Sequence, residues 1–158
     1  MRVRTQGFTL IELVVTVAIV GLLATAVFPL AQLASRRAKE QELRLALREL
    51  RDAIDAYKKA ADEGRVVLEV GQTGYPPTLD ALVEGVSDAR NPESAAIYFL
   101  RRVPRDPFYP DPDAPASTTW SLRSYASPPD DPQPGDDVYD VHSLSNGTSL
   151  AGDAYRDW

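Results

Sequence analysis

The chain of 158 residues contains no cysteine and only one histidine. Without cysteine there is no disulfide framework, no thiolate zinc site and no cysteine nucleophile. The sequence also lacks a phosphate-binding glycine loop, a HExxH metal motif and a GxSxG nucleophile motif. Acidic residues outnumber basic ones by 23 to 17, which disfavours general binding to nucleic acid. The sequence therefore predicts neither an enzyme nor a nucleic-acid partner, and its length indicates one domain with an appendage.

An uncharged stretch runs from Leu13 to Ser35. As a helix it would be roughly 30 Å long, which matches the hydrocarbon core of a bilayer. Basic residues flank it on both sides and do not decide its orientation: Arg2, Arg4, Arg36, Arg37 and Lys39. One interpretation is a secretory signal peptide with small residues at 24–26 for cleavage, and a second is a plain membrane anchor. A third, a buried core helix, is disfavoured because so short a chain cannot enclose an apolar helix.

Glu12 separates these interpretations because it lies among apolar residues, between Ile11 and Leu13. A carboxylate in lipid costs about 2–3 kcal/mol, so it should be rare there unless it has a partner. Neither the core of a signal peptide nor a single anchor has a use for such a charge.

The segment Gly7-Phe8-Thr9-Leu10-Ile11-Glu12-Leu13 resembles the N-terminus of type IV pilins and type II secretion pseudopilins. Their signature is a short basic leader, a glycine, an aromatic residue and a glutamate that follows the glycine by five positions, as here. The resemblance implies that a membrane prepilin peptidase cuts after Gly7 on the cytoplasmic side and N-methylates Phe8. Residues 1–7 are then a cleaved leader, residues 8–35 a transmembrane and filament-core helix, and residues 36–158 a periplasmic globular domain.

Cleavage would leave a cationic amine on Phe8, and we expect the Glu12 carboxylate to pair with this amine on a neighbouring subunit. In a setting of low dielectric constant, such a pair gives each charge a partner. An unpaired Glu12 penalises the monomer in the membrane, and assembly relieves that penalty.

An amphipathic helix is predicted for residues 36–62, because apolar residues recur at steps of three and four: Leu43, Leu47, Leu50, Ile54, Tyr57 and Ala61. No proline or glycine separates it from the membrane stretch after Pro29. We therefore expect one helix of about 55 residues that ends near Gly64. Pro29 lacks an N–H and clashes with the preceding turn, which predicts a kink or local loss of helix near residues 25–29.

The rest of the chain predicts short elements joined by loops. After the long helix, residues 65–70 are expected to form a strand or a loop. Residues 78–83 and residues 93–101 are each expected to form a short helix. Trp120–Tyr125 and Asp137–His142 alternate as antiparallel strands do, with a loop rich in proline and aspartate between them. The predicted fold class is α+β and type IV pilin-like, with a long N-terminal helix packed on a small antiparallel sheet and irregular C-terminal loops.

Three motifs in the C-terminal half resemble the major pseudopilins of type II secretion: Tyr75-Pro76-Pro77-Thr78, Leu100 to Phe108 (LRRVPRDPF) and Asp137-Val138-Tyr139-Asp140. The resemblance implies a structural subunit that spans the bacterial inner membrane once. It would polymerise with itself and with other pseudopilins at an inner-membrane assembly platform, and the filament would help drive protein secretion across the outer membrane. The alternative is a subunit of a type IV pilus used for adhesion, motility or DNA uptake.

The same resemblance implies a calcium ion in the last loop, held by carboxylates and backbone carbonyls. Asn146 is the best match to the first aspartate of that site, and Asp153 alone matches a later pair. Calcium takes six to eight oxygen ligands, commonly from several carboxylates, and this loop offers few. The alternative is a solvated loop with an Asn-Gly turn, capped by Trp158 packing on the sheet.

Overall fold

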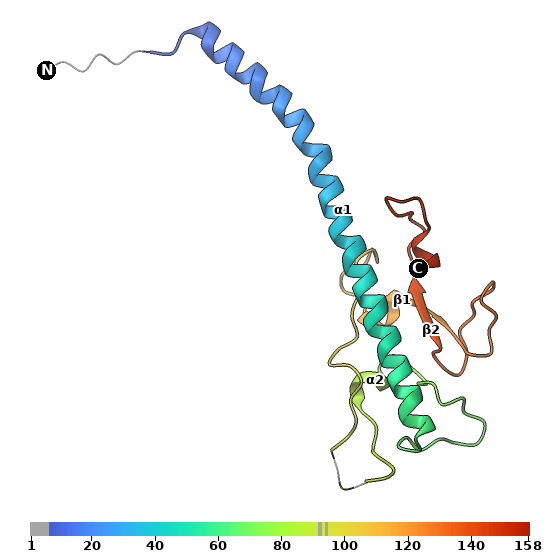
Figure 1. The fold of residues 1–158 in the computed structure, drawn as a ribbon. Coiled ribbons are helices and arrows are strands. Elements are labelled where there is room, and N and C mark those ends of the chain that lie inside the picture. The colour runs from blue at the N-terminus through green and yellow to red at the C-terminus, as the bar shows by residue number, and fades with distance from the viewer. Residues whose placement is uncertain (1–6, 92, 94) are drawn as a thin grey trace, which may run out of the picture. The chain divides into compact units, whose positions relative to one another are not determined.

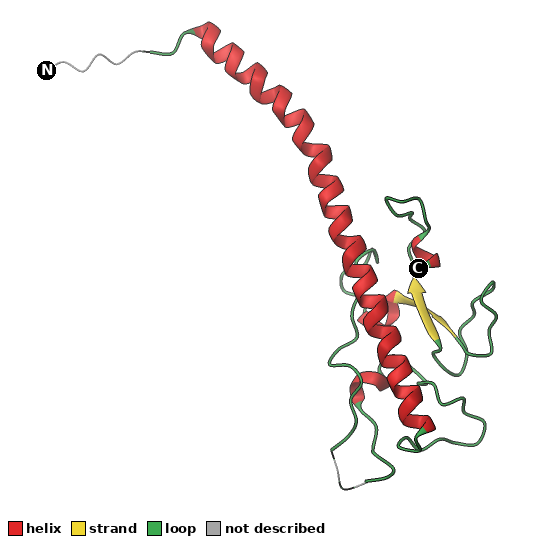
Figure 2. Ribbon diagram, viewed as in Figure 1, coloured by secondary structure: helices red, strands yellow, loops and turns green. Residues whose placement is uncertain are grey.

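The computed structural model describes residues 7–91, 93 and 95–158 (Figure 1). The elements of these residues, in chain order, are α1 (Leu10–Asp62), α2 (Ala81–Glu84), η1 (Ala116–Thr119), β1 (Trp120–Arg123), β2 (Asp140–Ser143) and η2 (Tyr155–Asp157). The chain divides into two compact units, of which the first ends at Ala38 and the second runs from Lys39 to Trp158. A long helix packed on a small antiparallel sheet confirms the α+β, pilin-like fold class (Figure 2).

Helix α1 begins at Leu10 and ends at Asp62, close to the predicted range. Pro29 lies inside it, and the helix continues through residues 25–29, so the predicted local loss of helix is wrong. Proline removes one backbone hydrogen bond, whereas opening a turn would remove several more. The helix therefore tolerates Pro29.

A Schellman motif ends α1. Gly64 has the left-handed backbone conformation, with φ of 66°, that glycine adopts without steric strain. The N–H of Gly64 donates to the carbonyl of Ala61, and the N–H of Arg65 donates to the carbonyl of Ala60, both at 2.9 Å. This geometry confirms the helix end that the sequence predicts near Gly64.

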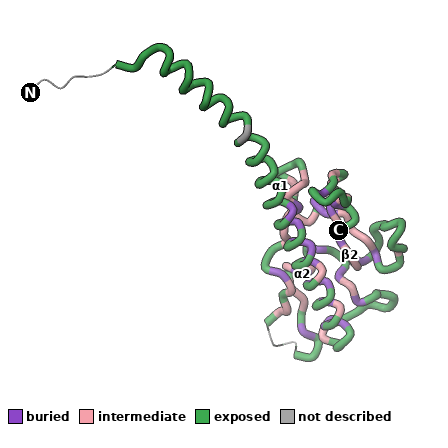
Figure 3. Tube along the Cα trace, turned by 45° about the horizontal axis from the view of Figure 1, so that its top comes forward, coloured by how far each residue is buried: buried purple, intermediate pink, exposed green. Residues whose placement is uncertain are grey.

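The hydrophobic core of the second unit lies along the part of α1 that this unit contains (Figure 3). The whole predicted apolar stripe is buried there: Leu43, Leu47, Leu50, Ile54, Tyr57 and Ala61. The same core contains residues of α2 and the sheet region: Leu79, Leu82, Trp120, Val138 and Val141. The amphipathic pattern thus identified the face of α1 that packs on the rest of the domain.

Strands β1 and β2 pair in antiparallel fashion, with Trp120 opposite Ser143 and Arg123 opposite Asp140. Both predicted strands exist. β1 ends at Arg123, before the predicted end at Tyr125, and β2 begins at Asp140, after the predicted start at Asp137. The N–H of Tyr125 donates to the Asp137 carboxylate at 2.8 Å, so this backbone donor does not extend the ladder. Side-chain hydrogen bonding from the loop therefore sets where the sheet ends.

The helix predicted over residues 93–101 is wrong for residues 93 and 95–101, which contain no helix. Ile97 instead forms an isolated antiparallel bridge with Val86. The N–H groups of Phe99 and Leu100 both donate to the carbonyl of Leu82, at 3.0 and 2.9 Å. Tertiary hydrogen bonds replace the helical ones because Leu100 packs in the core. Residues 65–70 form a loop, and α2, which begins at Ala81, confirms the short helix expected within residues 78–83.

We expect Leu50→Ala to lower the free energy of unfolding by about 2–5 kcal/mol, because it would leave a cavity in the core. Leu50 is 0% exposed, whereas Leu45 on the same helix is 63% exposed. The matched change Leu45→Ala should therefore alter the free energy of unfolding by less than about 0.5 kcal/mol. Denaturant unfolding of the full chain in detergent micelles, followed by tryptophan fluorescence, measures both. Equal losses from the two variants would contradict this packing.

Candidate functional site

The predicted cleavage point lies at the start of the described chain. Gly7, Phe8 and Thr9 precede α1 in non-helical backbone. Phe8 is 80% exposed, and a Cβ built on Gly7 would have no described heavy atom within 4 Å. The bond between Gly7 and Phe8 is therefore accessible in this part of the structure, while residues 1–6 of the predicted leader lie outside the described residues.

Thr9 caps the N-terminus of α1, a role that the sequence analysis missed. Its Oγ1 accepts a hydrogen bond from the N–H of Glu12 at 3.3 Å, and its carbonyl accepts one from the N–H of Leu13 at 3.2 Å. Thr9 and Glu12 have the spacing of a capping box, T-x-x-E, and that spacing could have identified the cap. The structure thus places the Glu12 carboxylate in the first turn of the helix.

The position of Glu12 lowers the cost of its charge without removing it. The positive end of a helix dipole stabilises an anion in the first turn by about 0.3–1 kcal/mol. A carboxylate within the membrane costs about 2–3 kcal/mol, which is more than this gain. The helix dipole alone therefore does not offset the cost that this carboxylate would have in lipid.

The part of α1 in the first unit exposes an apolar surface. An 18-residue window of the helix has a mean hydropathy of 2.5, and none of this window is buried. The exposed side chains include Leu13, Val17, Val20, Leu23 and Phe28. Covering a side chain of this kind stabilises by about 1.5–3 kcal/mol, so such a surface is covered by lipid or by other protein.

Asp106, from the motif Arg105-Asp106-Pro107-Phe108, is a buried polar residue that joins three segments. Its carboxylate accepts hydrogen bonds from Ser143 Oγ at 2.6 Å and from the N–H of Phe108 at 2.8 Å. Its own N–H donates to Thr119 Oγ1 at 3.2 Å. These bonds satisfy a buried charge and hold a proline-rich loop against β2. The motif therefore serves the structure of the domain.

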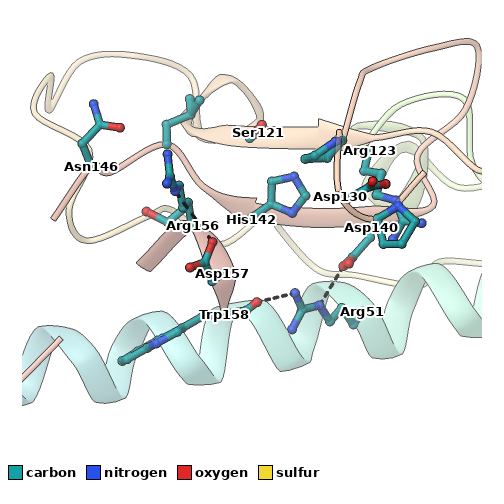
Figure 4. Close-up of a pocket in the computed structure, with 14 residues that line it drawn as sticks. Arg51, Ser121, Arg123, Asp130, Asp140, His142, Asn146, Arg156, Asp157 and Trp158 are labelled. Carbon is teal, nitrogen blue, oxygen red and sulfur yellow. Dashed lines mark hydrogen bonds and ion pairs between the residues drawn. The ribbon is translucent and has the colours of Figure 1, made fainter. Parts of the chain in front are cut away.

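A pocket of about 800 Å³ lies beside the sheet (Figure 4). Arg51 of α1 donates from Nε to Asp140 Oδ1 at 2.8 Å and from a terminal nitrogen to the carbonyl of Trp158 at 2.6 Å. Arg123 donates to the carbonyl of Ser127 at 3.2 Å. Both guanidinium groups therefore link separate segments of the domain through hydrogen bonds.

His142 lies in this pocket, opposite Ser121 across the two strands (Figure 4). Its Nε2 is buried and has no hydrogen-bond partner in the described part of the chain. A base that activates a serine nucleophile is hydrogen-bonded to it, so this pair lacks the geometry of a catalytic site. Burial lowers the pKa of His142 below its ordinary value of 6.5; Asp140 opposes this shift, and Arg51 and Arg123 add to it.

The predicted calcium ligands Asn146 and Asp153 are both exposed. Within the described residues, no group of three or more histidine or acidic side chains could hold a metal ion. The backbone of Asp153 is already engaged, because its carbonyl accepts from the N–H of Ser149 at 2.7 Å. Calcium takes six to eight oxygen ligands, so the donor set found here does not fit it.

The pKa of His142 can be measured directly, because the chain has a single histidine. We expect an NMR titration of the full chain in micelles to give a midpoint below 6.5. The unfolded chain then binds more protons than the folded one in this window, so the free energy of unfolding decreases as the pH falls from about 6.5 toward the folded pKa. His142→Gln should remove this part of the pH dependence. A midpoint at or above 6.5 would contradict the buried environment.

Known proteins resemble the N-terminal segment and, over a longer stretch, about two thirds of the chain. The prokaryotic N-terminal methylation motif matches residues 2–28. The type II secretion system core protein G of Klebsiella pneumoniae is 36% identical over 115 residues, which cover 68% of this chain and 72% of that protein. Its counterpart in Aeromonas hydrophila is 34% identical over 109 residues, which cover 66% of this chain and 68% of that protein.

The core protein G of Vibrio cholerae is 32% identical over 111 residues, which cover 68% of both chains. No solved structure matches this chain. The similarity to these relatives covers about two thirds of this chain, so it extends beyond the methylation motif into the globular domain. This chain therefore belongs to the family of the type II secretion system core protein G, the major pseudopilins.

Proposed function

We propose that this protein is a structural subunit of a type II secretion pseudopilus, which polymerises through its N-terminal helix and helps drive proteins across the outer membrane. The observation that carries this function is an uncovered apolar helix with Glu12 in its first turn, in a chain of the core protein G family. A filament covers such a helix with the helices of neighbouring subunits. The names of the relatives favour this function over a subunit of a type IV pilus.

Processing is the first step of the proposed pathway. Prepilin peptidase cuts between Gly7 and Phe8 and methylates the new amine of Phe8. The methylation motif over residues 2–28 and the exposed backbone around Gly7 support this step. Residues 1–7 are then the leader, residues 8–35 the membrane and filament-core helix, and residues 36–158 the globular domain.

Pairing between subunits is the second step. The amine of Phe8 supplies the cation that Glu12 requires, and it comes from a neighbouring copy. A carboxylate and an ammonium group in a medium of low dielectric constant attract strongly, whereas either one alone is penalised. Assembly into a filament with other pseudopilins thus replaces two unfavourable charges with one pair.

The proposed location is the inner membrane, crossed once by the first part of α1, with the domain in the periplasm. This orientation follows from a leader that is cut on the cytoplasmic side, because the flanking basic residues do not decide it. An inner-membrane assembly platform would add the processed subunits to the filament. The length and the mean hydropathy of 2.5 in α1 support a membrane-spanning role before assembly.

The domain is proposed to act without catalysis and without nucleic acid. His142 and Ser121 are not hydrogen-bonded as a nucleophile and its base would be. Residues 103–158 contain ten aspartates and three arginines, so the domain would repel a phosphate backbone.

Gly7→Val should block processing, because a branched side chain would occupy the cleavage point. Immunoblots should then show a longer band that does not shift, and proteins destined for secretion should accumulate in the periplasm. Gly21→Val is the control for processing, since Gly21 lies within α1 and away from the cut. Normal secretion by cells that contain only the uncut protein would refute the proposed pathway. Loss of surface pili and twitching with secretion intact would instead support the type IV pilus.

Glu12→Ala should leave insertion and cleavage intact and prevent incorporation into filaments. Removing one member of a buried ion pair costs about 3–5 kcal/mol, which corresponds to a decrease of more than about a hundredfold in incorporation. Shearing and sedimentation of filaments, with immunoblots of the membrane fraction, would measure it. Glu12→Asp keeps the charge on a shorter side chain and should retain part of the assembly. Filament yields from Glu12→Ala equal to those of the wild type would exclude the pairing role.

A further inference from the structure

Residues 144–158, the closing segment, fold back on themselves. The N–H of Ser149 donates to the carbonyl of Asp153 at 2.7 Å, and the N–H of Tyr155 donates to the carbonyl of Gly147 at 3.1 Å. The Oγ of Ser149 accepts from the N–H of Asp153 at 3.2 Å. Backbone oxygens that could serve a metal ion are thus used in hydrogen bonds within the segment.

Glu40 of α1 joins this segment to the helix. It is 8% exposed, which is unusual for an acidic side chain. Its Oε1 accepts a hydrogen bond from the N–H of Leu150 at 2.8 Å and another from the hydroxyl of Tyr155 at 2.9 Å. One carboxyl oxygen therefore binds the segment at two points, one on its backbone and one on a buried side chain.

Tyr155 is the centre of the packing around this contact. It is buried, its ring stacks on Phe108 with centroids 4.2 Å apart, and its edge meets Trp158 at 5.3 Å. A Cβ on Gly147 would lie 3.0 Å from the Tyr155 ring, so the backbone approaches the ring closely here. The tyrosine hydroxyl is held in position by this packing, which favours its bond to Glu40.

Two further residues of α1 bind the closing segment through Trp158. The guanidinium of Arg44 lies 4.3 Å from the centroid of the Trp158 ring, and Arg51 donates to the Trp158 carbonyl at 2.6 Å. Positions 40, 44 and 51 differ by four and by seven residues, so they lie on one face of a helix. Trp158 therefore contacts α1 through both its ring and its backbone.

We propose that the Glu40 carboxyl group holds the closing segment on α1, and that the segment keeps its conformation without a calcium ion. In this arrangement the acidic group comes from the helix and accepts hydrogen bonds from the segment. A calcium site would need several acidic groups on the segment, and the exposed Asp153 and Asn146 do not form one. This inference concerns the fold of the domain and does not depend on the proposed role in secretion.

Cleavage by trypsin after Arg156 tests the proposal, because this side chain is 68% exposed and lies in the closing segment. Under native conditions the rate of cleavage follows the population in which the segment is open. The full chain in detergent micelles is digested with added calcium or with EDTA, and the fragment that ends at Arg156 is quantified by mass spectrometry. Near-UV circular dichroism confirms that each variant remains folded.

Glu40→Ala should accelerate this cleavage by at least about tenfold, which corresponds to about 1.4 kcal/mol. Tyr155→Phe keeps the ring packing and removes only the hydroxyl donor, so it should accelerate cleavage less than Glu40→Ala does. If Glu40→Ala does not fold, the cleavage rate of Tyr155→Phe tests the proposal. Glu42→Gln, an exposed acid on the same helix, is the matched control and should cleave like the wild type. Neither calcium nor EDTA should change the rate for the wild-type chain.

Two results would overturn the proposal. The first is cleavage of both Glu40→Ala and Tyr155→Phe at the wild-type rate, which would mean that Glu40 does not hold the segment. The second is slower cleavage of the wild-type chain in calcium, with the effect abolished by Asp153→Ala, which would assign the role to a metal ion.

Discussion

A carboxylate in the first turn of an apolar helix is costly in lipid unless an opposite charge lies near it, and the proposed function depends on this cost. Thr9 and the helix dipole stabilise the first turn, but their contribution is smaller than the cost of the Glu12 charge in lipid. In the proposed pathway the missing cation is created by cleavage before Phe8. Cleavage of this one peptide bond therefore removes the leader and also creates the amine that pairs with Glu12, so polymerisation requires processing.

Helix α1 meets two different requirements along its length. In the first unit, an 18-residue window of the helix is strongly apolar and none of it is buried, as suits contact with lipid or with neighbouring helices. From Lys39 onward the apolar residues are confined to a stripe that the domain buries. Both parts are continuous helix because Pro29 removes too few hydrogen bonds to interrupt it.

The globular domain has a sheet of only two strands in its described residues, and polar side chains link its loops to the helix and the sheet around the hydrophobic core. Asp106 fastens a proline-rich loop to β2, Arg51 joins α1 to Asp140, and Glu40 reaches the last loop. Proline-rich segments have fewer backbone N–H donors for a ladder, so side chains supply the connections. Such contacts specify one arrangement of loops that backbone pairing alone would leave open.

Local sequence patterns are enough to identify several features: the apolar helix, its amphipathic continuation, the end at Gly64, the two strands and the pilin-like N-terminus. Periodicity and short motifs report these because each involves residues close together in the chain. Only long-range packing sets the hydrogen bonds of Phe99 and Leu100 to Leu82, in place of a helix over residues 95–101, and the contact of Glu40 with a segment more than 100 residues away. Hydrogen bonds between distant residues leave no periodic trace in the sequence, because their partners meet only once the core has packed.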